Sequence, residues 1–211
     1  MREIILGSAI SYLIGSLPTA YIFGRLLKGI DIRDFGSGNV GATNALRVLG
    51  KGPGITVLVL DMLKGFLSVT LLADIISSRP MQISEEALRV IFGLGCICGH
   101  NWTIFLRFKG GKGIATTFGV LAGLALKISG VKLIFPLVLL TWLLVFVISR
   151  IVSLSSVISG IALPMYMAIF RQSSTLVTLS IILACFILLR HRSNLKRLFQ
   201  GKEPRLSFKK P

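Results

Sequence analysis

The feature that most constrains this chain is a series of long apolar segments that cover most of its length. A helix needs about 20 mostly apolar residues to cross the hydrocarbon core of a bilayer. Only 15% of the 211 residues are charged, whereas a soluble domain carries roughly 25%. The sequence therefore predicts an all-α, polytopic integral membrane protein with about seven transmembrane helices. The predicted spans are Ile4–Gly24, Pro53–Ile76, Val90–Leu106, Gly113–Val131, Leu133–Ser149, Ile151–Phe170 and Ser173–Leu189.

The fourth segment, Gly113–Val131, is the weakest of the set. Its uncharged part ends at Leu126, and Lys127 would have to extend from it to the lipid head groups. If this segment did not span, six helices would remain and both termini would lie on the same side of the membrane.

Basic residues orient the chain, because loops rich in Lys and Arg stay on the cytoplasmic side. Alternate loops divide the basic residues 17 against 5. We therefore expect the N-terminus outside and the C-terminus inside. No internal repeat or linker interrupts the chain, so we expect a single transmembrane domain over residues 1–211. The segments expected to be cytoplasmic are Arg25–Gly52, Arg107–Lys112, Arg150 and the tail from Arg190.

Two ionisable residues, Asp61 and Lys64, lie inside the second apolar segment. They are three residues apart, so they share a helix face and can form an ion pair. A charge pair within a membrane is costly unless it faces the protein interior or water. The pair either links helices structurally or brings Lys64 toward a site at the inner leaflet.

The first cytoplasmic loop contains a run of small and amide residues, GSGNVGATN from Gly36 to Asn44, followed by Arg47. Its glycines match the dinucleotide-binding pattern G-x-G-x-x-G, but that pattern requires a preceding strand, and here an apolar helix precedes it. Glycines would let a phosphate approach the backbone N–H groups, and Thr43 or Asn44 could cap a short helix whose N-terminus favours an anion. Arg47, one turn further on, could add a charged contact.

The second candidate site is His100 followed by the run FKGGKGIATT, which begins at Phe108. It is not a Walker A phosphate loop, because Lys112 is followed by glycine instead of Ser or Thr. It offers two ammonium groups on a flexible glycine hinge, which leads into a helix with Thr116 in its first turn. A positive-inside anchor would explain the lysines, but not the glycines interleaved with them.

The third candidate site opens the C-terminal tail. On a continuing helix His191 and Asn194 would share a face, and Gly201 would end that helix. Arg190, Asn194 and Arg197 would form a neighbouring stripe. The alternative is an arginine cluster that anchors the last span at the lipid head groups.

Few acids lie in the cytoplasmic segments, namely Asp31, Asp34 and Glu203. They form no carboxylate cluster for Mg²⁺ or Zn²⁺ and no nucleophile–base–acid set. Ser37 could act as a nucleophile, but no base can be assigned to it. Nucleic acid is not the expected partner, because the basic residues lie in short loops without interleaved aromatics. We expect electrostatic positioning of phosphates, with no metal and no cofactor.

Together the three motifs resemble the bacterial acyl-phosphate:glycerol-3-phosphate acyltransferase family (PlsY-type). The matching stretches are GSGNVGATN at 36–44, HNWTIFLRFKGGKGIAT at 100–116 and HRSNLKRLFQGKE at 191–203. The resemblance implies transfer of a fatty acyl group from acyl phosphate to the first hydroxyl of glycerol-3-phosphate, giving lysophosphatidate. This is the first step of membrane phospholipid synthesis, and the family uses neither acyl-CoA nor a metal. The resemblance also implies a multi-pass protein of the bacterial inner membrane that acts as a monomer, with its active site facing the cytoplasm.

Residue by residue, the resemblance implies two sets of site residues. The catalytic set, expected to hold glycerol-3-phosphate, is Ser37, Arg47, Lys112, His191 and Asn194. In the family, the substrate's own phosphate takes the hydroxyl proton, while the residues themselves leave His191 open as a base. The set expected to bind substrate phosphate is Gly36, Gly38, Asn39, Gly41, Thr43, Asn44, Lys109, Gly110, Gly111, Gly113, Thr116 and Gly201.

A small transporter for an anionic phosphate ester is the alternative class. Transporters usually bind their ligands near the bilayer midplane, often within inverted repeats. The sequence has no repeat and, apart from Asp61 and Lys64, no polar cluster at the middle of a span. The enzyme is therefore the favoured hypothesis.

Overall fold

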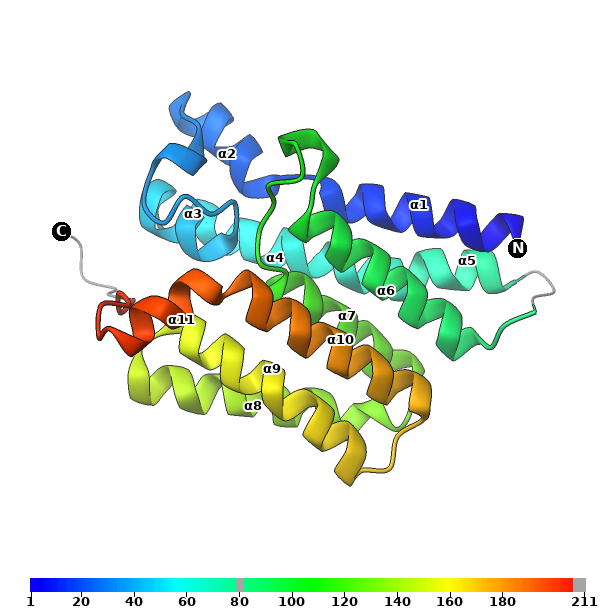
Figure 1. The fold of residues 1–211 in the computed structure, drawn as a ribbon. Helices are drawn as coiled ribbons and strands as arrows, with labels where there is room; N and C mark the ends of the chain where they lie inside the picture. Colours follow the sequence, from blue (N-terminus) through cyan, green and yellow to red (C-terminus); the bar gives the residue numbers. More distant parts are fainter. Residues whose placement is uncertain (79–81, 207–211) are drawn as a thin grey trace. The chain divides into compact units, whose positions relative to one another are not determined.

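The computed structural model describes residues 1–78 and 82–206, and every regular element within these ranges is helical (Figure 1). This confirms the predicted all-α fold. The chain divides into two compact units, Met1–Ser129 and Gly130–Pro211. We describe each unit by itself.

Each of the seven predicted apolar segments falls on helix, but by length and composition fewer qualify as spans. Five helices in the described ranges are long and apolar enough to cross a membrane, and a helix pair bent by 62° would be a sixth. The predicted fourth span is the short apolar helix α7 (Ile114–Lys127), of 14 residues. The five long helices are Arg2–Lys28, Lys51–Ser77, Glu85–Leu106, Val131–Ser149 and Val152–Ile169, and the bent pair is Ser174–Arg190 with Arg192–Phe199.

The first predicted span is not one straight helix. It divides into α1 (Arg2–Ser16) and α2 (Thr19–Lys28), with Leu17 in an extended conformation between them. Pro18 explains the break, because proline disfavours helical geometry in the residue before it and has no N–H to donate. The break places α2 and the loop after it at one end of the first unit (Figure 1).

The remaining helices of the first unit pack in pairs, α1 against α6 and α4 against α7 (Figure 1). Small residues bring α4 and α7 close together. A Cβ on Gly65 would overlap the carbonyl oxygen of Thr116, and one on Gly119 would overlap that of Met62. Apolar surface gains little from leaving lipid, so such close backbone contact is a main source of helix association in membranes. The elements are α3 (Ala42–Leu49), α4 (Lys51–Leu67), a π-helical turn (Ser68–Leu72), α5 (Ala73–Ser77) and α6 (Glu85–Asn101).

The second unit is a row of three apolar helices followed by a short polar one. Helix α9 packs against both α8 and α10. The segment after α11 returns to the start of α9, where the Leu206 N–H donates to the Arg150 carbonyl at 2.8 Å. The elements are α8 (Val131–Ser149), α9 (Val152–Ile169), α10 (Ser174–Arg190) and α11 (Arg192–Phe199).

The close contact of α4 and α7 can be tested with Gly119→Ala. The added methyl would meet the backbone of Met62. We therefore expect the free energy of unfolding to fall by about 1–3 kcal/mol, which is typical of overpacking. The measurement is the melting temperature of the purified protein in detergent. Gly52→Ala is the matched control, since a Cβ there meets nothing within 4 Å, and it should leave the melting temperature unchanged or raise it. A Gly119→Ala protein as stable as the wild type would contradict this packing.

Candidate active site

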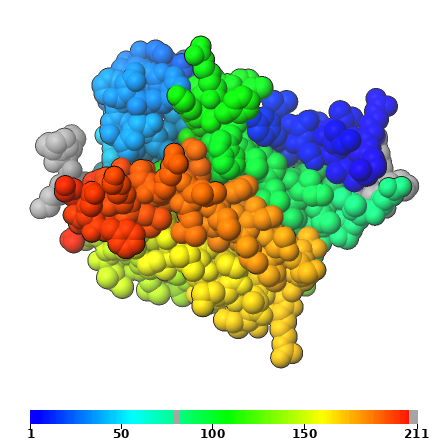
Figure 2. Space-filling view, viewed as in Figure 1, coloured from blue at the N-terminus to red at the C-terminus, as the bar shows by residue number. Residues whose placement is uncertain are grey.

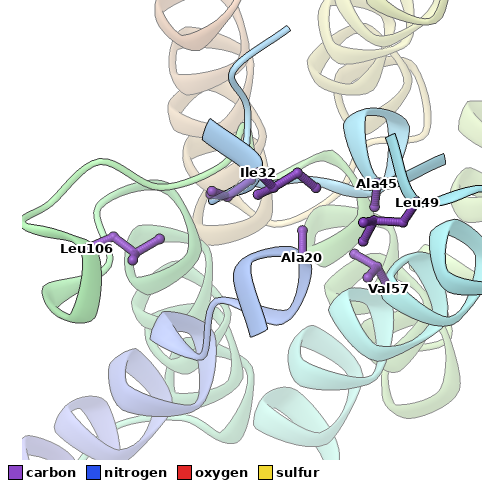
Figure 3. Close-up of a cluster of buried hydrophobic side chains, with 7 residues drawn as sticks. Ala20, Ile32, Ala45, Leu49, Val57 and Leu106 are labelled. Atoms are coloured by element: carbon purple, nitrogen blue, oxygen red, sulfur yellow. The ribbon is translucent and has the colours of Figure 1, made fainter. Parts of the chain in front are cut away.

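The first two motifs lie at the same end of the first unit, on a common apolar core. Val40 from the GSGNVGATN loop and Leu106 from the segment after α6 belong to one buried cluster (Figure 3). Figure 2 shows the two segments, blue and green, side by side at the surface of this unit. The cluster fixes the spacing of the two loops without using their polar groups. Its buried members are Ala20, Ile32, Val40, Ala45, Leu49, Val57 and Leu106.

Asn44 organises the GSGNVGATN loop from inside. Its side chain is 1% exposed. The amide oxygen accepts from the Ser37 N–H at 2.8 Å, and the amide nitrogen donates to the carbonyls of Ile32 and Phe35 at 3.2 and 3.1 Å. Gly36 has a φ of 62°, and a Cβ there would overlap the Asn44 amide. Asn44 therefore adds side-chain hydrogen bonds to the backbone of the turn that leads into this loop.

The predicted capping of this short helix is wrong. Helix α3 begins at Ala42 and its N-cap is Gly41, without a side-chain cap. Thr43 and Asn44 instead lie in the first turn. The helix N-terminus still directs its first N–H groups toward the loop, which is the geometry that favours an anion.

An ion pair stiffens the chain just before this loop. The Asp31 carboxylate accepts two hydrogen bonds from the Arg33 guanidinium, at 2.9 Å to Oδ1 and 2.6 Å to Oδ2. These bonds lower the pKa of Asp31 to about 2. The guanidinium also lies 5.4 Å from the centre of the Tyr21 ring, within range of a cation–π contact. Asp31 is therefore a structural anchor of the loop.

The lysine–glycine loop of the second motif is tied to the end of α6. The Gly110 and Gly111 N–H groups donate to the carbonyls of Asn101 and His100, at 3.2 and 2.9 Å. A Cβ on either glycine would overlap this helix end, and at Gly111 the overlap is with the His100 imidazole. These two glycines thus allow close packing on α6, and their N–H groups are engaged there. From the residues alone we expected a flexible glycine hinge here, whereas both glycines pack against the end of α6.

Helix α7 begins directly after this loop. Its N-cap is Gly113, with a φ of 76°, and Thr116 lies in the first turn, as predicted. The Thr116 hydroxyl is buried without a hydrogen-bond partner in the described part of the chain, and so are both polar atoms of the Asn101 side chain. Such groups are rare in folded proteins and call for a ligand or water. Asn101 was missed by sequence reasoning, although it directly follows His100.

The third motif does not lie on one continuing helix, contrary to prediction. Helix α10 ends at Arg190, His191 is its C-cap, and α11 leaves at an angle of 62°. His191 Nδ1 lies 2.8 Å from the carbonyl oxygen of Ile187, and since a carbonyl can only accept, Nδ1 carries the proton. The bend also places Arg190 on a different helix from Asn194 and Arg197, with which it was predicted to form a stripe. Gly201 follows the end of α11 with a φ of 66°, as expected of a helix-ending glycine.

Glu203 is the organising residue of this motif, and sequence reasoning had only counted it among the acids. Burial alone would raise its pKa, but hydrogen bonds from three side chains outweigh burial and hold the pKa below its usual range. The donors are Asn194 and Ser153 to Oε1, at 2.5 and 2.7 Å, and Arg197 to Oε2 at 2.7 Å.

Within residues 1–78 and 82–206, no three His, Cys, Asp or Glu side chains are grouped so as to hold a metal ion.

The other predicted site residues differ in exposure. Ser37, Arg47, Gly38, Lys109 and Gly201 are exposed, Asn39, Gly41, Thr43 and Lys112 are half-buried, and His191 and Asn194 are buried.

Apolar helices that end in glycine-rich basic loops, held in place by buried polar side chains, define an integral membrane protein suited to phosphorylated compounds. The family described as glycerol-3-phosphate acyltransferase matches residues 5–201. A protein of that name from Parasynechococcus marenigrum (strain WH8102) is 44% identical over 201 residues, covering 95% of this chain and 89% of its own. One from Desulforamulus reducens is 43% identical, covering 95% and 94%. This chain belongs to the glycerol-3-phosphate acyltransferase family, as its motifs predict.

Two solved structures resemble the whole chain. A crystal structure of PlsY (YgiH), an integral membrane glycerol 3-phosphate acyltransferase in its glycerol 3-phosphate form, matches with a TM-score of 0.84 and 33% identity. The match covers 97% of this chain and 96% of that one. The lysophosphatidic acid form of the same enzyme matches with a TM-score of 0.81 and 32% identity, over 97% and 95%. The integral membrane fold is therefore confirmed.

The Glu203 contacts predict a pH-dependent stability. A carboxyl whose pKa is lowered on folding stabilises the protein above its unfolded pKa, about 4.3, and this contribution is lost as the pH falls through the folded pKa. Glu203→Gln should lower the free energy of unfolding by about 2 kcal/mol at pH 7, because it weakens hydrogen bonds to a charged group. The measurement is the melting temperature of both proteins between pH 7 and acidic pH.

The difference between wild type and Glu203→Gln should shrink as the pH falls below the unfolded pKa. Asp34→Asn, at an exposed acid of the other unit, is the control and should leave the pH dependence as it is. A Glu203→Gln protein whose melting curve coincides with that of the wild type at every pH would show that the carboxylate is not an anchor.

Proposed function

We propose that this chain transfers a fatty acyl group from acyl phosphate to the first hydroxyl of glycerol-3-phosphate, giving lysophosphatidate. The observation that carries the proposal is the family match over residues 5–201, which includes the first two motifs and the third as far as Gly201. The ligands named for the similar solved structures, glycerol 3-phosphate and lysophosphatidic acid, are the acceptor and the product of this reaction.

The reaction needs positioning more than a protein nucleophile. The hydroxyl oxygen of glycerol-3-phosphate attacks the acyl carbonyl carbon, and the bond from that carbon to the phosphate oxygen breaks. Phosphate leaves with the bonding electron pair and takes up the hydroxyl proton. Acyl phosphate is a mixed anhydride with a good leaving group, so the protein's part is to hold two anions together and stabilise the developing charge.

The acyl phosphate is held, in this proposal, by the start of α7. First-turn N–H groups of a helix have no partners within the helix and favour an anion. The Thr116 hydroxyl is buried there without a partner in the described ranges, which supports a ligand at this point. The adjoining Lys109 and Lys112 supply positive charge, and the GSGNVGATN loop supplies the second wall.

The residues that the resemblance assigns to glycerol-3-phosphate are Ser37, Arg47 and Lys112 in the first unit and His191 and Asn194 in the second. Because Nδ1 of His191 donates to Ile187, Nε2 is the ring nitrogen that would accept from the substrate. The amide of Asn194 is oriented by Glu203. The substrate phosphate remains the proposed acceptor of the hydroxyl proton.

Because one family match spans residues 5–201, we propose that residues 1–211 work as one catalytic domain, and, as the resemblance implies, as a monomer. The excess of basic residues in their segments supports a cytoplasmic position for the motif loops, and the resemblance supports the inner membrane. Acyl chains in the bilayer are the hydrophobic partner of the exposed helix surfaces.

The function is tested with purified protein, acyl phosphate and glycerol-3-phosphate, by measuring lysophosphatidate. Arg47→Ala and Lys112→Ala should each lower kcat/KM about 10²-fold or more, typical of a lost charged donor in an active site. Lys51→Ala removes an exposed basic residue at the start of α4 and should leave the rate unchanged. EDTA should have no effect.

Full activity in both the Arg47 and the Lys112 variants would refute the assignment of these residues. A wild-type protein that makes no lysophosphatidate, yet carries glycerol-3-phosphate into proteoliposomes without an acyl donor, would favour the transporter instead.

A further inference from the structure

A buried charge cluster lies inside the first unit, and the proposed reaction does not use it. Asp61 is 1% exposed and Lys64 6%. The Lys64 ammonium donates to Asp61 Oδ1 at 2.7 Å, and the Thr19 hydroxyl donates to the same oxygen at 2.6 Å. The ion pair predicted from the sequence is therefore present. It joins α4 to α2, the helix that leads into the first motif loop.

The same cluster satisfies the backbone at the break between α1 and α2. The Lys64 ammonium donates to the carbonyl of Leu17, the residue that precedes Pro18. The same carbonyl accepts from the Thr19 N–H at 3.0 Å, so Lys64 is its second donor at a place where the bilayer core offers no water. Lys64 thus has a structural role at the helix break, which does not by itself require a carboxylate at position 61.

A third group, His100, faces the Asp61 carboxylate from α6. His100 Nδ1 lies 3.8 Å from Asp61 Oδ1. The other carboxylate oxygen, Oδ2, is buried without a hydrogen-bond partner in the part of the chain that the structure describes. Replacing a buried ion pair with apolar residues often leaves stability unchanged, so packing alone does not explain a carboxylate at this place.

On its other side, the His100 ring forms the wall of the second motif loop. Its Nε2 occupies the space that a Cβ on Gly111 would need. The His100 carbonyl also accepts from the Gly111 N–H at 2.9 Å. The next residue is Lys112, so the orientation of this imidazole sets the path of the backbone that carries the lysine.

We infer that Asp61 is a positioning residue, which acts through His100 to fix the Lys109–Gly113 loop and the ammonium of Lys112. At 3.8 Å the carboxylate acts on the ring by electrostatic attraction, which favours the tautomer with the proton on Nδ1. The inference rests on the proposed function, in which Lys112 binds glycerol-3-phosphate.

The test measures the dissociation constant for glycerol-3-phosphate by calorimetry, beside the melting temperature. The main variant combines Asp61→Asn with Lys64→Gln, so that no buried charge is left alone. It should weaken binding about tenfold, in the range of coupled neighbouring residues. In a Lys112→Ala background the same pair of changes should weaken binding no further, because Asp61 acts only through that lysine.

Asp74→Asn is the matched control. Asp74 forms another ion-pair cluster of the same unit, with Arg89 at 2.7 Å and with Lys127, and does not contact the motif loops in the described contacts. It should lower the melting temperature without changing the dissociation constant. His100→Gln leaves the Asp61–Lys64 pair intact and should reproduce the binding defect, so it decides the question if the double variant does not fold.

Two results would overturn the inference in a protein whose wild type binds and acylates glycerol-3-phosphate. One is unchanged binding in both the Asp61→Asn/Lys64→Gln and the His100→Gln variants. The other is that Asp61→Asn/Lys64→Gln weakens binding as much in the Lys112→Ala background as in the wild type. That result would mean that Asp61 acts independently of the lysine. A wild type that neither binds nor acylates the substrate would instead refute the proposed function itself.

Discussion

Hydrogen bonding of irregular backbone at the ends of apolar helices is the constraint on which the rest of this structure depends. A bilayer core offers no partner for a free N–H or carbonyl group, so a loop close to it must be satisfied by the protein. Asn44 does this for the first motif loop, the last carbonyls of α6 do it for the second, and Lys64 does it at the Leu17 break. In the first two cases the group that satisfies the backbone also contacts a residue of the proposed site, Ser37 in one loop and Gly110 and Gly111 in the other.

This constraint explains why the second motif combines glycine with lysine. A flexible loop would let the Lys112 ammonium sample many positions, and ordering it on binding would cost free energy. Packed against α6 without side chains at Gly110 and Gly111, the loop is instead set by helix backbone. Just beyond it lies the Thr116 hydroxyl, which has no hydrogen-bond partner among the described residues. The glycines therefore contribute to anion binding through the rigidity of what surrounds them.

The sequence allowed the helices to be predicted well and their interruptions poorly. Apolar length and loop charge locate the helical segments, because both follow from the bilayer. The bend at His191 was missed because helical periodicity runs through it, with no proline or glycine to mark it. The Glu203 anchor depends on a left-handed turn at Gly201 that brings the carboxylate back to Asn194. Contacts across such a turn are tertiary, so spacing alone could not supply them.

A site without a protein nucleophile depends more on positioning than one that forms a covalent intermediate. When the rate comes from holding two anions at reacting distance, a displacement of about 1 Å can cost two orders of magnitude. Exposed lysines and arginines cannot provide that precision by themselves, since their side chains are long and mobile. It has to come from buried groups with few degrees of freedom, and Asn44, His100 and Glu203 are all of this kind. Each lies one contact away from a residue proposed to bind substrate, so we expect the buried polar groups to be as intolerant of substitution as the charged groups they orient.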